Sequence, residues 1–361
     1  MLNIPNAKFY ADKILIEEKN ISIYNGKIIS IEETQGNTEQ EFVVPGFIDL
    51  QIYGAGGKLF SAEPTVESLM IMENDLLKKG TTGFLACMAT NTPEVFNAGI
   101  AAAKEYRSSA KNFLGLHLEG PFLNPNRLGA HIPAFVRKAT LAEIKELLDF
   151  GDGVIKMMTI APELHDEDVI QYLLDHDVVV SLGHSDATFE EATNAYESGI
   201  QTTTHLFNAM TPIHHRAPGI PTAFFNHNKA MASIIVDGQH VDFEVVKLAY
   251  KLAGERLFLI TDAVTPCSTG PYQHIQKGNK FVMPDGTLSG SSLTMLEAVK
   301  NCVNHCDIEL SQAIRMATEH PAKLMGIENL TGKIAVEQPA NLLVLDNELN
   351  LKKVIFKGTN I

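Results

Sequence analysis

The stretch VPGFIDLQIYGAGG, residues 44–57, lies where short β-like pieces give way to a regular alternation of apolar runs and amphipathic stretches. Pro45 and Gly46 break the chain, and the apolar run that follows ends in Gln51, Tyr53 and a group of glycines. A short apolar run bounded by such breakers is typical of a buried strand. The polar residues at its end indicate that this strand opens into a site.

Further apolar, β-branched runs follow at regular intervals and, with the first, make eight predicted strands. They span residues 46–51, 81–90, 112–120, 154–163, 178–185, 202–208, 231–238 and 256–263. Amphipathic helical stretches lie between most of them, such as residues 66–80, 140–150, 166–177, 188–199 and 241–254. This repeated strand-then-helix order predicts an α/β fold, a (β/α)8 TIM barrel. A doubly wound open sheet is the alternative, but no G-x-G-x-x-G follows the first strand, which disfavours its nucleotide-binding form.

Both ends of the chain differ from this pattern. Residues 1–45 and 335–361 contain short β-like pieces separated by turns, and Asn25-Gly26 between alternating apolar residues predicts a hairpin. We therefore expect both ends to form one small β-sandwich domain, and residues 46–334 to form the barrel.

Charge and cysteine content limit the class of protein. With 29 basic and 43 acidic residues the net charge is −14, which argues against nucleic acid and anionic membranes as partners but not against a small anionic substrate. Four cysteines in 361 residues make no disulfide framework. The cluster CVNHC, residues 302–306, lies in a helical pattern, and we interpret it as structural. The chain shows neither a signal-peptide pattern nor a membrane-spanning run, so we expect a cytoplasmic protein.

Polar residues stand at the ends of six predicted strands, where a barrel of this kind builds its active site. They are Gln51, Glu119, His184, His205, Asp237 and Asp262. Each has an ordinary alternative role, such as a helix cap, a turn or a buried polar group. Together, the carboxylate of Glu119 and the imidazoles of His184 and His205 match a catalytic site with three protein ligands. The sequence therefore predicts one divalent metal ion per subunit, with zinc favoured and iron, manganese or cobalt as alternatives.

Two further residues and two loops complete the predicted site. Asp262 is the candidate general base, which takes a proton from water and returns it to a leaving nitrogen. His117 faces the same side of its strand as Glu119, so it is either a neighbour of the metal site or a buried histidine bonded to the backbone. Residues 124–138 and 208–228 are long loops rich in Pro, Gly and His, and loops of this length are usually functional.

Motifs along essentially the whole chain carry a family resemblance. In order, they are PGFIDLQIYGAGG, TTGFLACMAT, HLEGPFLNPNRLGAH, GHSDAT, THLFNAM, HRAPG, VDGQHV, LITDAV, GTLSGSSLTM and TGKIAVEQPANLLVLD. With them the sequence resembles the amidohydrolase superfamily and, within it, the N-acetylglucosamine-6-phosphate deacetylases. The resemblance implies a barrel with a β-sandwich from both termini, and a role in amino-sugar catabolism and cell-wall sugar recycling. It also implies hydrolysis of the acetamide of N-acetyl-D-glucosamine 6-phosphate to D-glucosamine 6-phosphate and acetate.

The same resemblance implies the substrate contacts. These are Ala130, His131, Asn208, Ala209, Arg216, Asp237, Gly238, Gln239, His240, Leu288, Ser289 and Gly290. Arg216 reaches the phosphate from a neighbouring subunit in the family, which implies a homodimer or homotetramer. His131 is a candidate to polarise the acetamide carbonyl, whereas we interpret His214 and His215 as surface residues.

The chain departs from the wider superfamily at the end of the first strand. Two-metal members carry His-x-His there, but this chain has Gln51 and Tyr53, whose amide and phenol are poor ligands near pH 7. We therefore predict a single ion, with Gln51 beside its water. Two other functions stay open: a hydrolase acting on a cyclic amide or another acylated sugar, and a barrel that binds without catalysis.

Overall fold

A parallel sheet lies at the centre of the computed structural model, which describes residues 1–11, 13–34 and 39–361. Within that part of the chain the sheet has eight strands, and its neighbours follow the order of the sequence. The strands are β5 (Phe47–Ile52), β8 (Thr81–Ala89), β9 (Phe113–Glu119), β10 (Ile155–Ile160), β11 (Val179–Leu182), β12 (Thr202–Thr203), β13 (Met231–Ile234) and β14 (Leu257–Leu259). All eight predicted strands are confirmed.

Hydrogen bonds between the first strand and the segment after the last one close the sheet into a ring. Asp262 N donates to Gln51 O over 3.0 Å, and Tyr53 N donates to Ala263 O over 2.9 Å. Ile52 and Ala263 form a parallel bridge at the same place. The closed barrel excludes the open-sheet alternative, and its closure brings the ends of the first and last strands together.

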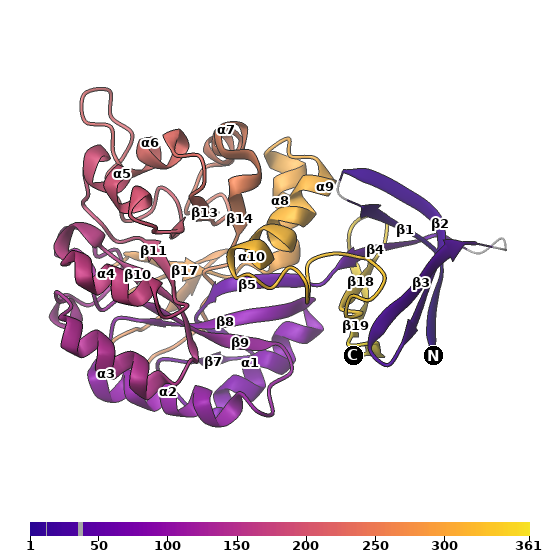
Figure 1. Cartoon of the computed structure of the whole chain (residues 1–361), viewed down its shortest axis with the longest axis horizontal. Helices are drawn as coiled ribbons and strands as arrows, with labels where there is room; N and C mark the ends of the chain where they lie inside the picture. The colour runs from indigo at the N-terminus through magenta and orange to yellow at the C-terminus, as the bar shows by residue number, and fades with distance from the viewer. Residues whose placement is uncertain (12, 35–38) are drawn as a thin grey trace.

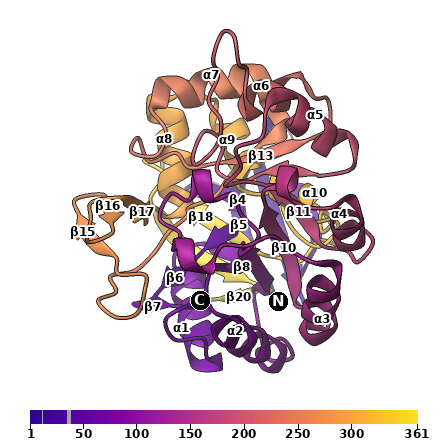
Figure 2. The ribbon, with the colours of Figure 1, turned by 90° about the vertical axis from the view of Figure 1, so that its left-hand side faces the viewer.

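Helices surround the barrel when it is viewed from its left-hand end (Figure 2). They are α1 (Val66–Lys78), α2 (Pro93–Tyr106), α3 (Leu141–Gly151), α4 (Glu167–Leu174), α5 (Phe189–Glu197), α6 (Ile220–Asn226), α7 (Phe243–Ala253), α8 (Met295–His305), α9 (Leu310–Ala317) and α10 (Glu319–Leu324). Short 3-10 helices lie at Pro125–Arg127, Pro133–Phe135, Pro162–Leu164 and Gly254–Arg256. Each of the five helical stretches named above is confirmed, and α6 lies inside the segment that we predicted as the loop 208–228. The described part of the chain has no helix long and apolar enough to cross a membrane.

Two small additions sit on the barrel. β6 (Gly54–Ala55) and β7 (Lys58–Leu59) pair after the first strand. β15 (Ile275–Lys277), β16 (Lys280–Val282) and β17 (Leu288–Ser291) form an antiparallel sheet after β14. Ser291 N donates to Asp262 O over 3.0 Å, so this small sheet is tied to the end of the last barrel strand. A side chain at Gly290 would meet Val264 Cγ1 at 2.7 Å, which explains glycine at this close approach.

Strands from both ends of the chain pair at the right of Figure 1. β1 (Leu2–Ala11), β2 (Ile14–Tyr24), β3 (Lys27–Glu33) and β4 (Glu41–Pro45) join β18 (Leu342–Leu345), β19 (Leu351–Phe356) and β20 (Thr359–Asn360) in one sheet, ordered β20-β19-β18-β4-β1-β2-β3. The predicted hairpin at Asn25-Gly26 is confirmed: both residues have positive φ, and Tyr24 pairs with Lys27.

The central strands β4 and β18 of this terminal sheet are buried on both faces. Along β4, Val43 packs in a core that belongs to the sheet, whereas Phe42 and Val44 pack in the core of the barrel. The same alternation along β18 follows from the two-residue period of a strand. We propose that residues 1–45 with 335–361 form one domain and residues 46–334 the other; residues 12 and 35–38 of the first lie outside the described part.

Cysteines of the CVNHC cluster support its structural interpretation. Cys302 lies in α8, Cys306 caps that helix, and both are buried free thiols. Burial raises the pKa of each thiol, of Cys306 to about 12. Neutral thiols of this kind act as small apolar groups in a core.

Gly46, at the junction of β4 and β5, leaves no room for a side chain. A Cβ there would lie 2.2 Å from Thr82 Oγ1 and 2.3 Å from its Cγ2. We expect Gly46→Ala to lower the free energy of unfolding by about 1–3 kcal/mol, measured by urea denaturation. Gly83→Ala is the matched control, because its nearest neighbour is the flexible end of Leu114 at 3.2 Å. Equal losses in the two variants would contradict this steric explanation.

Candidate active site

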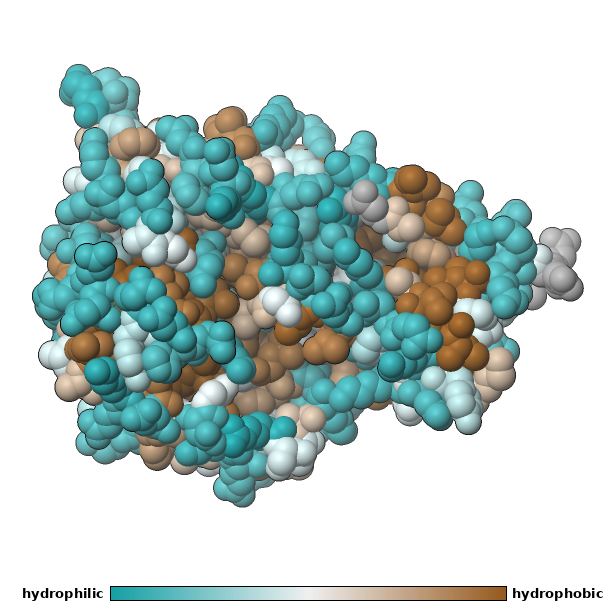
Figure 3. Space-filling view, viewed as in Figure 1, coloured by the Kyte–Doolittle hydropathy of each residue, from teal (hydrophilic) through white to brown (hydrophobic). Residues whose placement is uncertain are grey.

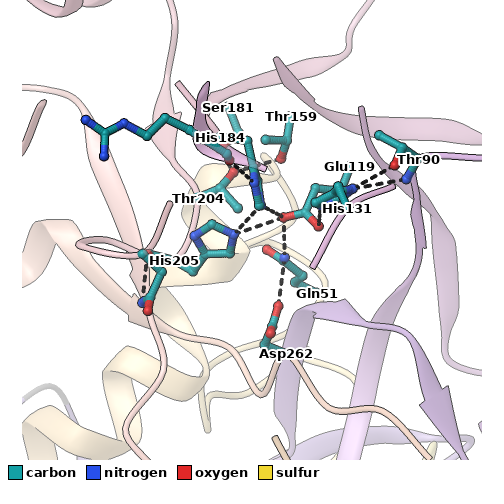
Figure 4. Close-up of polar contacts among 12 residues, drawn as sticks. Gln51, Thr90, Glu119, His131, Thr159, Ser181, His184, Thr204, His205 and Asp262 are labelled. Atoms are coloured by element: carbon teal, nitrogen blue, oxygen red, sulfur yellow. Dashed lines mark hydrogen bonds and ion pairs between the residues drawn. The ribbon is translucent and has the colours of Figure 1, made fainter. Parts of the chain in front are cut away.

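Three ligand atoms converge at the carboxyl-terminal ends of β9, β11 and β12 (Figure 4). Glu119 Oε1 lies 3.3 Å from His184 Nε2 and 3.0 Å from His205 Nε2, and the two imidazole nitrogens are 3.0 Å apart. Ligands about 2.1 Å from a tetrahedral ion are about 3.4 Å from one another. All three side chains are buried. The triangle therefore has the size of one face of a tetrahedral metal site.

Hydrogen bonding determines which ring nitrogen of His184 carries the proton. Its Nδ1 lies 2.9 Å from the carbonyl oxygen of Arg127, and since a carbonyl only accepts, Nδ1 carries the proton. Nε2 then offers a lone pair toward Glu119 and His205. Lone pairs that face one another in a buried site need a cation between them. These residues fit a divalent ion, and a metal-ligating histidine commonly donates its other N–H to such a carbonyl.

The second carboxylate oxygen of Glu119 faces hydrogen-bond donors instead. The Tyr53 hydroxyl donates to Oε2, and His131 Nε2 lies 2.9 Å from the same oxygen. Burial raises the pKa of the Glu119 carboxyl, but His184 and His131 outweigh it and hold the pKa well below its usual range. The carboxylate is therefore anionic, with its two oxygens in different surroundings.

His131 also places a nitrogen near this cluster, within 4.8 Å of ligand atoms of Glu119 and His184. However, Thr90 N donates to His131 Nδ1 over 3.3 Å, so the proton must be on Nε2. Burial lowers the pKa of His131 to about 4, which keeps the ring neutral. With Nδ1 occupied and Nε2 donating, His131 is a hydrogen-bond donor, and the donor set favours His205 as the third ligand.

Asp262 lies at the opposite wall of the barrel mouth, joined to Glu119 through Gln51. Gln51 Nε2 is 2.9 Å from Glu119 Oε1 and 2.9 Å from Asp262 Oδ1, as Figure 4 shows. Burial raises the pKa of Asp262 above its ordinary value, although His205 and His240 oppose the shift. A carboxylate with raised proton affinity beside a candidate metal site is suited to general-base chemistry.

His240 stands behind Asp262 and is held by Asp237. Its Nε2 is 3.9 Å from Asp262 Oδ2, while its Nδ1 is 2.7 Å from Asp237 Oδ2. Burial acts to raise the pKa of Asp237, but hydrogen bonding to His240 outweighs it, and the net shift is downward. Asp237 therefore orients His240.

Several site residues have left-handed backbone conformations. The φ angles of His184, His205 and Asp262 are 48°, 31° and 53°, each just beyond a barrel strand. Side chains other than glycine rarely adopt this region, and residues held there concentrate at functional sites. The turn that ends each strand thus aims its side chain into the barrel mouth.

A cavity of about 280 Å³ opens above the ligand triangle. Most of the predicted site residues line it, namely Glu119, Ala130, His131, His184, His205, Asn208, Ala209, His240, Asp262, Leu288, Ser289 and Gly290. Gln51 lies behind this wall. Asp237, Gly238 and Gln239 do not line the cavity; the side chain of Asp237 acts through His240, and Gln239 is exposed.

His117 and Arg216 lie away from the cavity. The ring of His117 is fully buried, with Nδ1 3.0 Å from Leu50 O and Nε2 2.8 Å from Thr159 Oγ1. His117 is thus a buried histidine bonded to the backbone, which is one of the two roles considered for it. Burial lowers the pKa of His117 to about 4. Arg216 is exposed on the loop between β12 and α6, which projects from the body in Figure 1, with His214 and His215 exposed beside it.

The sequence matches the model of the amidohydrolase family over residues 42–361. The chain belongs to this family. It is 36% identical to N-acetylglucosamine-6-phosphate deacetylase of Haemophilus influenzae, covering 90% of this chain and 87% of that one. It is 34% identical to N-acetylgalactosamine-6-phosphate deacetylase of a Shewanella species, covering 88% and 82%.

One solved structure similar to this chain carries a bound sugar phosphate. It is N-acetyl-D-glucosamine-6-phosphate deacetylase from Mycobacterium smegmatis, as a mutant in complex with N-acetyl-D-glucosamine-6-phosphate. The TM-score is 0.91 at 31% identity, over 98% of both chains. The barrel and the terminal sheet therefore keep the arrangement seen in that enzyme.

Some amidohydrolase site residues were not predicted as such. Tyr53 was considered only as a failed ligand, yet its hydroxyl contacts Glu119. Tyr272 and His274 line the cavity from the segment between β14 and β15. Tyr272 donates to Thr90 O over 2.6 Å and so supports the wall that holds His131. Their only sequence signal is a pair of polar aromatic residues in an irregular stretch.

Proposed function

We propose that this amidohydrolase removes the acetyl group of N-acetyl-D-glucosamine 6-phosphate, giving D-glucosamine 6-phosphate and acetate. The observation that carries the proposal is the buried triangle of Glu119, His184 and His205, with Asp262 opposite, at the floor of a cavity. Relatives named as deacetylases of amino-sugar phosphates support the substrate class.

We assign one divalent ion, with zinc favoured, to Glu119, His184 and His205. A bound ion of this kind polarises a carbonyl oxygen and lowers the pKa of water. Carboxylate and imidazole ligands also suit iron, manganese and cobalt. Cytoplasmic location is proposed alongside, because the buried cysteines are kept as thiols.

Protein groups then account for the proton transfers. Asp262 takes a proton from the attacking water and returns it to the leaving nitrogen, which needs a carboxylate within hydrogen-bond reach of both. Gln51 holds Asp262 by its amide nitrogen, while its Oε1 is buried without a partner in the described chain and can accept from that water. The Nε2–H of His131 contacts Glu119 Oε2 in this structure, and we assign it to the carbonyl oxygen of the substrate as negative charge develops there.

Phosphate recognition requires a group from outside this cavity. None of the described residues that line it is a lysine or an arginine. Arg216 lies on a projecting loop, whose surroundings at the upper left of Figure 3 are covered by hydrophilic residues. A guanidinium binds phosphate with two hydrogen bonds. We therefore assign Arg216 to the phosphate of a neighbouring subunit's substrate, in a homodimer or homotetramer, with His240, Asn208, Ser289 and adjoining backbone along the sugar.

Acetate release tests the assignment directly. We expect N-acetylglucosamine 6-phosphate to be cleaved with a far higher kcat/KM than N-acetylglucosamine. N-acetylgalactosamine 6-phosphate tests the substrate of the Shewanella relative and the alternative of another acylated sugar. Equal rates with and without the phosphate would contradict the assignment, and no release from any of the three would leave a barrel that binds without catalysis.

Arg216→Ala is expected to raise KM for the phosphorylated sugar by about 10- to 100-fold. This is the usual loss of affinity when a hydrogen bond between charged groups is removed. Co-expression with Asp262→Asn tests whether Arg216 acts across the interface. A mixed oligomer has a site with intact Asp262 and a partner with intact Arg216, so activity should exceed that of either variant alone. The control pairs Asp262→Asn with His184→Asn, which both damage their own site and should not complement. Failure of Arg216→Ala to complement would place Arg216 in its own subunit's site.

A further inference from the structure

The two carboxylate oxygens of Glu119 have different contacts. Oε1 faces His184 Nε2 and His205 Nε2, at 3.3 and 3.0 Å, and Gln51 Nε2 donates to it over 2.9 Å. Oε2 instead accepts from the Tyr53 hydroxyl and from His131 Nε2. Oε1 is therefore turned to the ligand triangle, whereas Oε2 lies outside the triangle and is held by the Tyr53 and His131 donors.

Tyr53 is built firmly into this position. It lies just beyond β5, its backbone N–H donates to Ala263 O over 2.9 Å, and its side chain is buried. Gln51 Nε2 lies 3.0 Å from the Tyr53 oxygen, beside its shorter contacts of 2.9 Å with Glu119 Oε1 and Asp262 Oδ1. An ionised carboxylate only accepts, and the phenol must therefore donate to Glu119.

His131 cannot hold Oε2 through the whole reaction if it serves the substrate. Its Nε2–H is a single donor, and in the proposed mechanism it turns to the acetamide carbonyl oxygen. Tyr53 is then the donor left on Oε2. A carboxylate that loses its outer hydrogen bonds is free to rotate and to bind an ion through both oxygens.

We propose that Tyr53 is a positioning residue, which holds Glu119 by Oε2 so that the carboxylate binds the metal ion through Oε1 alone. The inference rests on the metal site of the proposed function. It gives Tyr53 a role: the phenol occupies the side of Glu119 where a second cation would otherwise bind. The centre is kept at one ion with one coordination mode.

The test compares metal binding in Tyr53→Phe and in the wild type, without any sugar. We expect Tyr53→Phe to bind zinc about 10- to 100-fold more weakly, the usual loss when a residue behind a metal ligand is removed, as measured by chelator competition. Tyr106→Phe is the matched control. It also loses a buried phenol that donates to a carboxylate, but that carboxylate is Glu73, and neither residue lines the cavity. Its zinc affinity should equal that of the wild type.

Substitution of cobalt(II) for zinc gives a second measurement, the visible absorption of the ion. This absorption would not change if Tyr53 only stabilised the fold. Four-coordinate cobalt(II) absorbs visible light more strongly than five-coordinate cobalt(II). If Glu119 becomes free to bind through both oxygens, Tyr53→Phe should absorb more weakly than the wild type and Tyr106→Phe. The unfolding temperature of each apoprotein shows whether a variant is folded.

Clear outcomes separate this inference from the proposed function. Unchanged zinc affinity and an unchanged cobalt spectrum in Tyr53→Phe would overturn it, as would equal losses in both phenylalanine variants or two ions per wild-type chain. A wild-type protein that binds no divalent ion would instead overturn the metal site itself.

Discussion

Asp262→Asn should lower kcat by about 10²- to 10⁴-fold, the usual contribution of general acid–base catalysis, while metal content stays at the wild-type value. The carboxylate is the group that takes and returns the proton, and an amide cannot do so. Its place in the site is kept, because an asparagine oxygen can still accept from Gln51 Nε2. Asparagine also tolerates the φ of 53° at this position.

Steady-state acetate release and metal analysis of the same preparation measure this effect. Asp175→Asn is the matched control, since Asp175 is an exposed carboxylate at the end of α4 whose change should alter kcat by no more than about twofold. Activity of Asp262→Asn near that of the control would remove Asp262 from the chemistry. Loss of the ion together with activity would make it a ligand instead.

Metal removal should abolish activity and lower the unfolding temperature, and added divalent ion should restore both. An ion at about 1,000 times its dissociation constant stabilises the folded state by about 4 kcal/mol, because it binds the folded triangle and not the unfolded chain. Thermal unfolding with and without a chelator measures the shift.

Two variants show whether this shift comes from the proposed ligands. Glu119→Gln replaces the carboxylate of the triangle, so its unfolding temperature should no longer respond to chelator. Asp262→Asn leaves the triangle intact and should respond as the wild type does. A chelator response that survives in Glu119→Gln would place the stabilising ion elsewhere in the protein.

Local sequence patterns were sufficient to predict most of the barrel. They failed where tertiary packing determines whether a segment is helical. Continuous apolar, β-branched runs predicted all eight barrel strands, since burial on both sides of the sheet demands them. α2 was not among the helical stretches named from the sequence, and Gly99 interrupts its alanine-rich pattern. A Cβ at Gly99 would meet Met88 Sδ at 2.5 Å, so contact with β8 requires the glycine that helix propensity disfavours. α6 was missed because its proline and the preceding Gly219 are also typical of loops.

The candidate site shows the same division. Strand ends are legible in a sequence, and in a barrel they meet at one mouth, so Glu119, His184, His205 and Asp262 could be named together. Which atom of each side chain faces the site could not be predicted from the sequence. The proton of His184 is set by Arg127 O, and that of His131 by Thr90 N, both contacts between loops far apart in the chain.

By itself, the sequence determined the barrel, the identity of its polar strand ends and the absence of His-x-His, because these depend on residue type and local period. Only the tertiary structure decided which contacts Gln51 and Tyr53 make in place of the two histidines. Barrel closure between β5 and the end of β14 brings Gln51 onto Asp262, and the order β5-β8-β9 in the sheet brings Tyr53 onto Glu119. Such contacts join residues more than 60 positions apart, and their geometry follows from the packed backbone rather than from any local pattern.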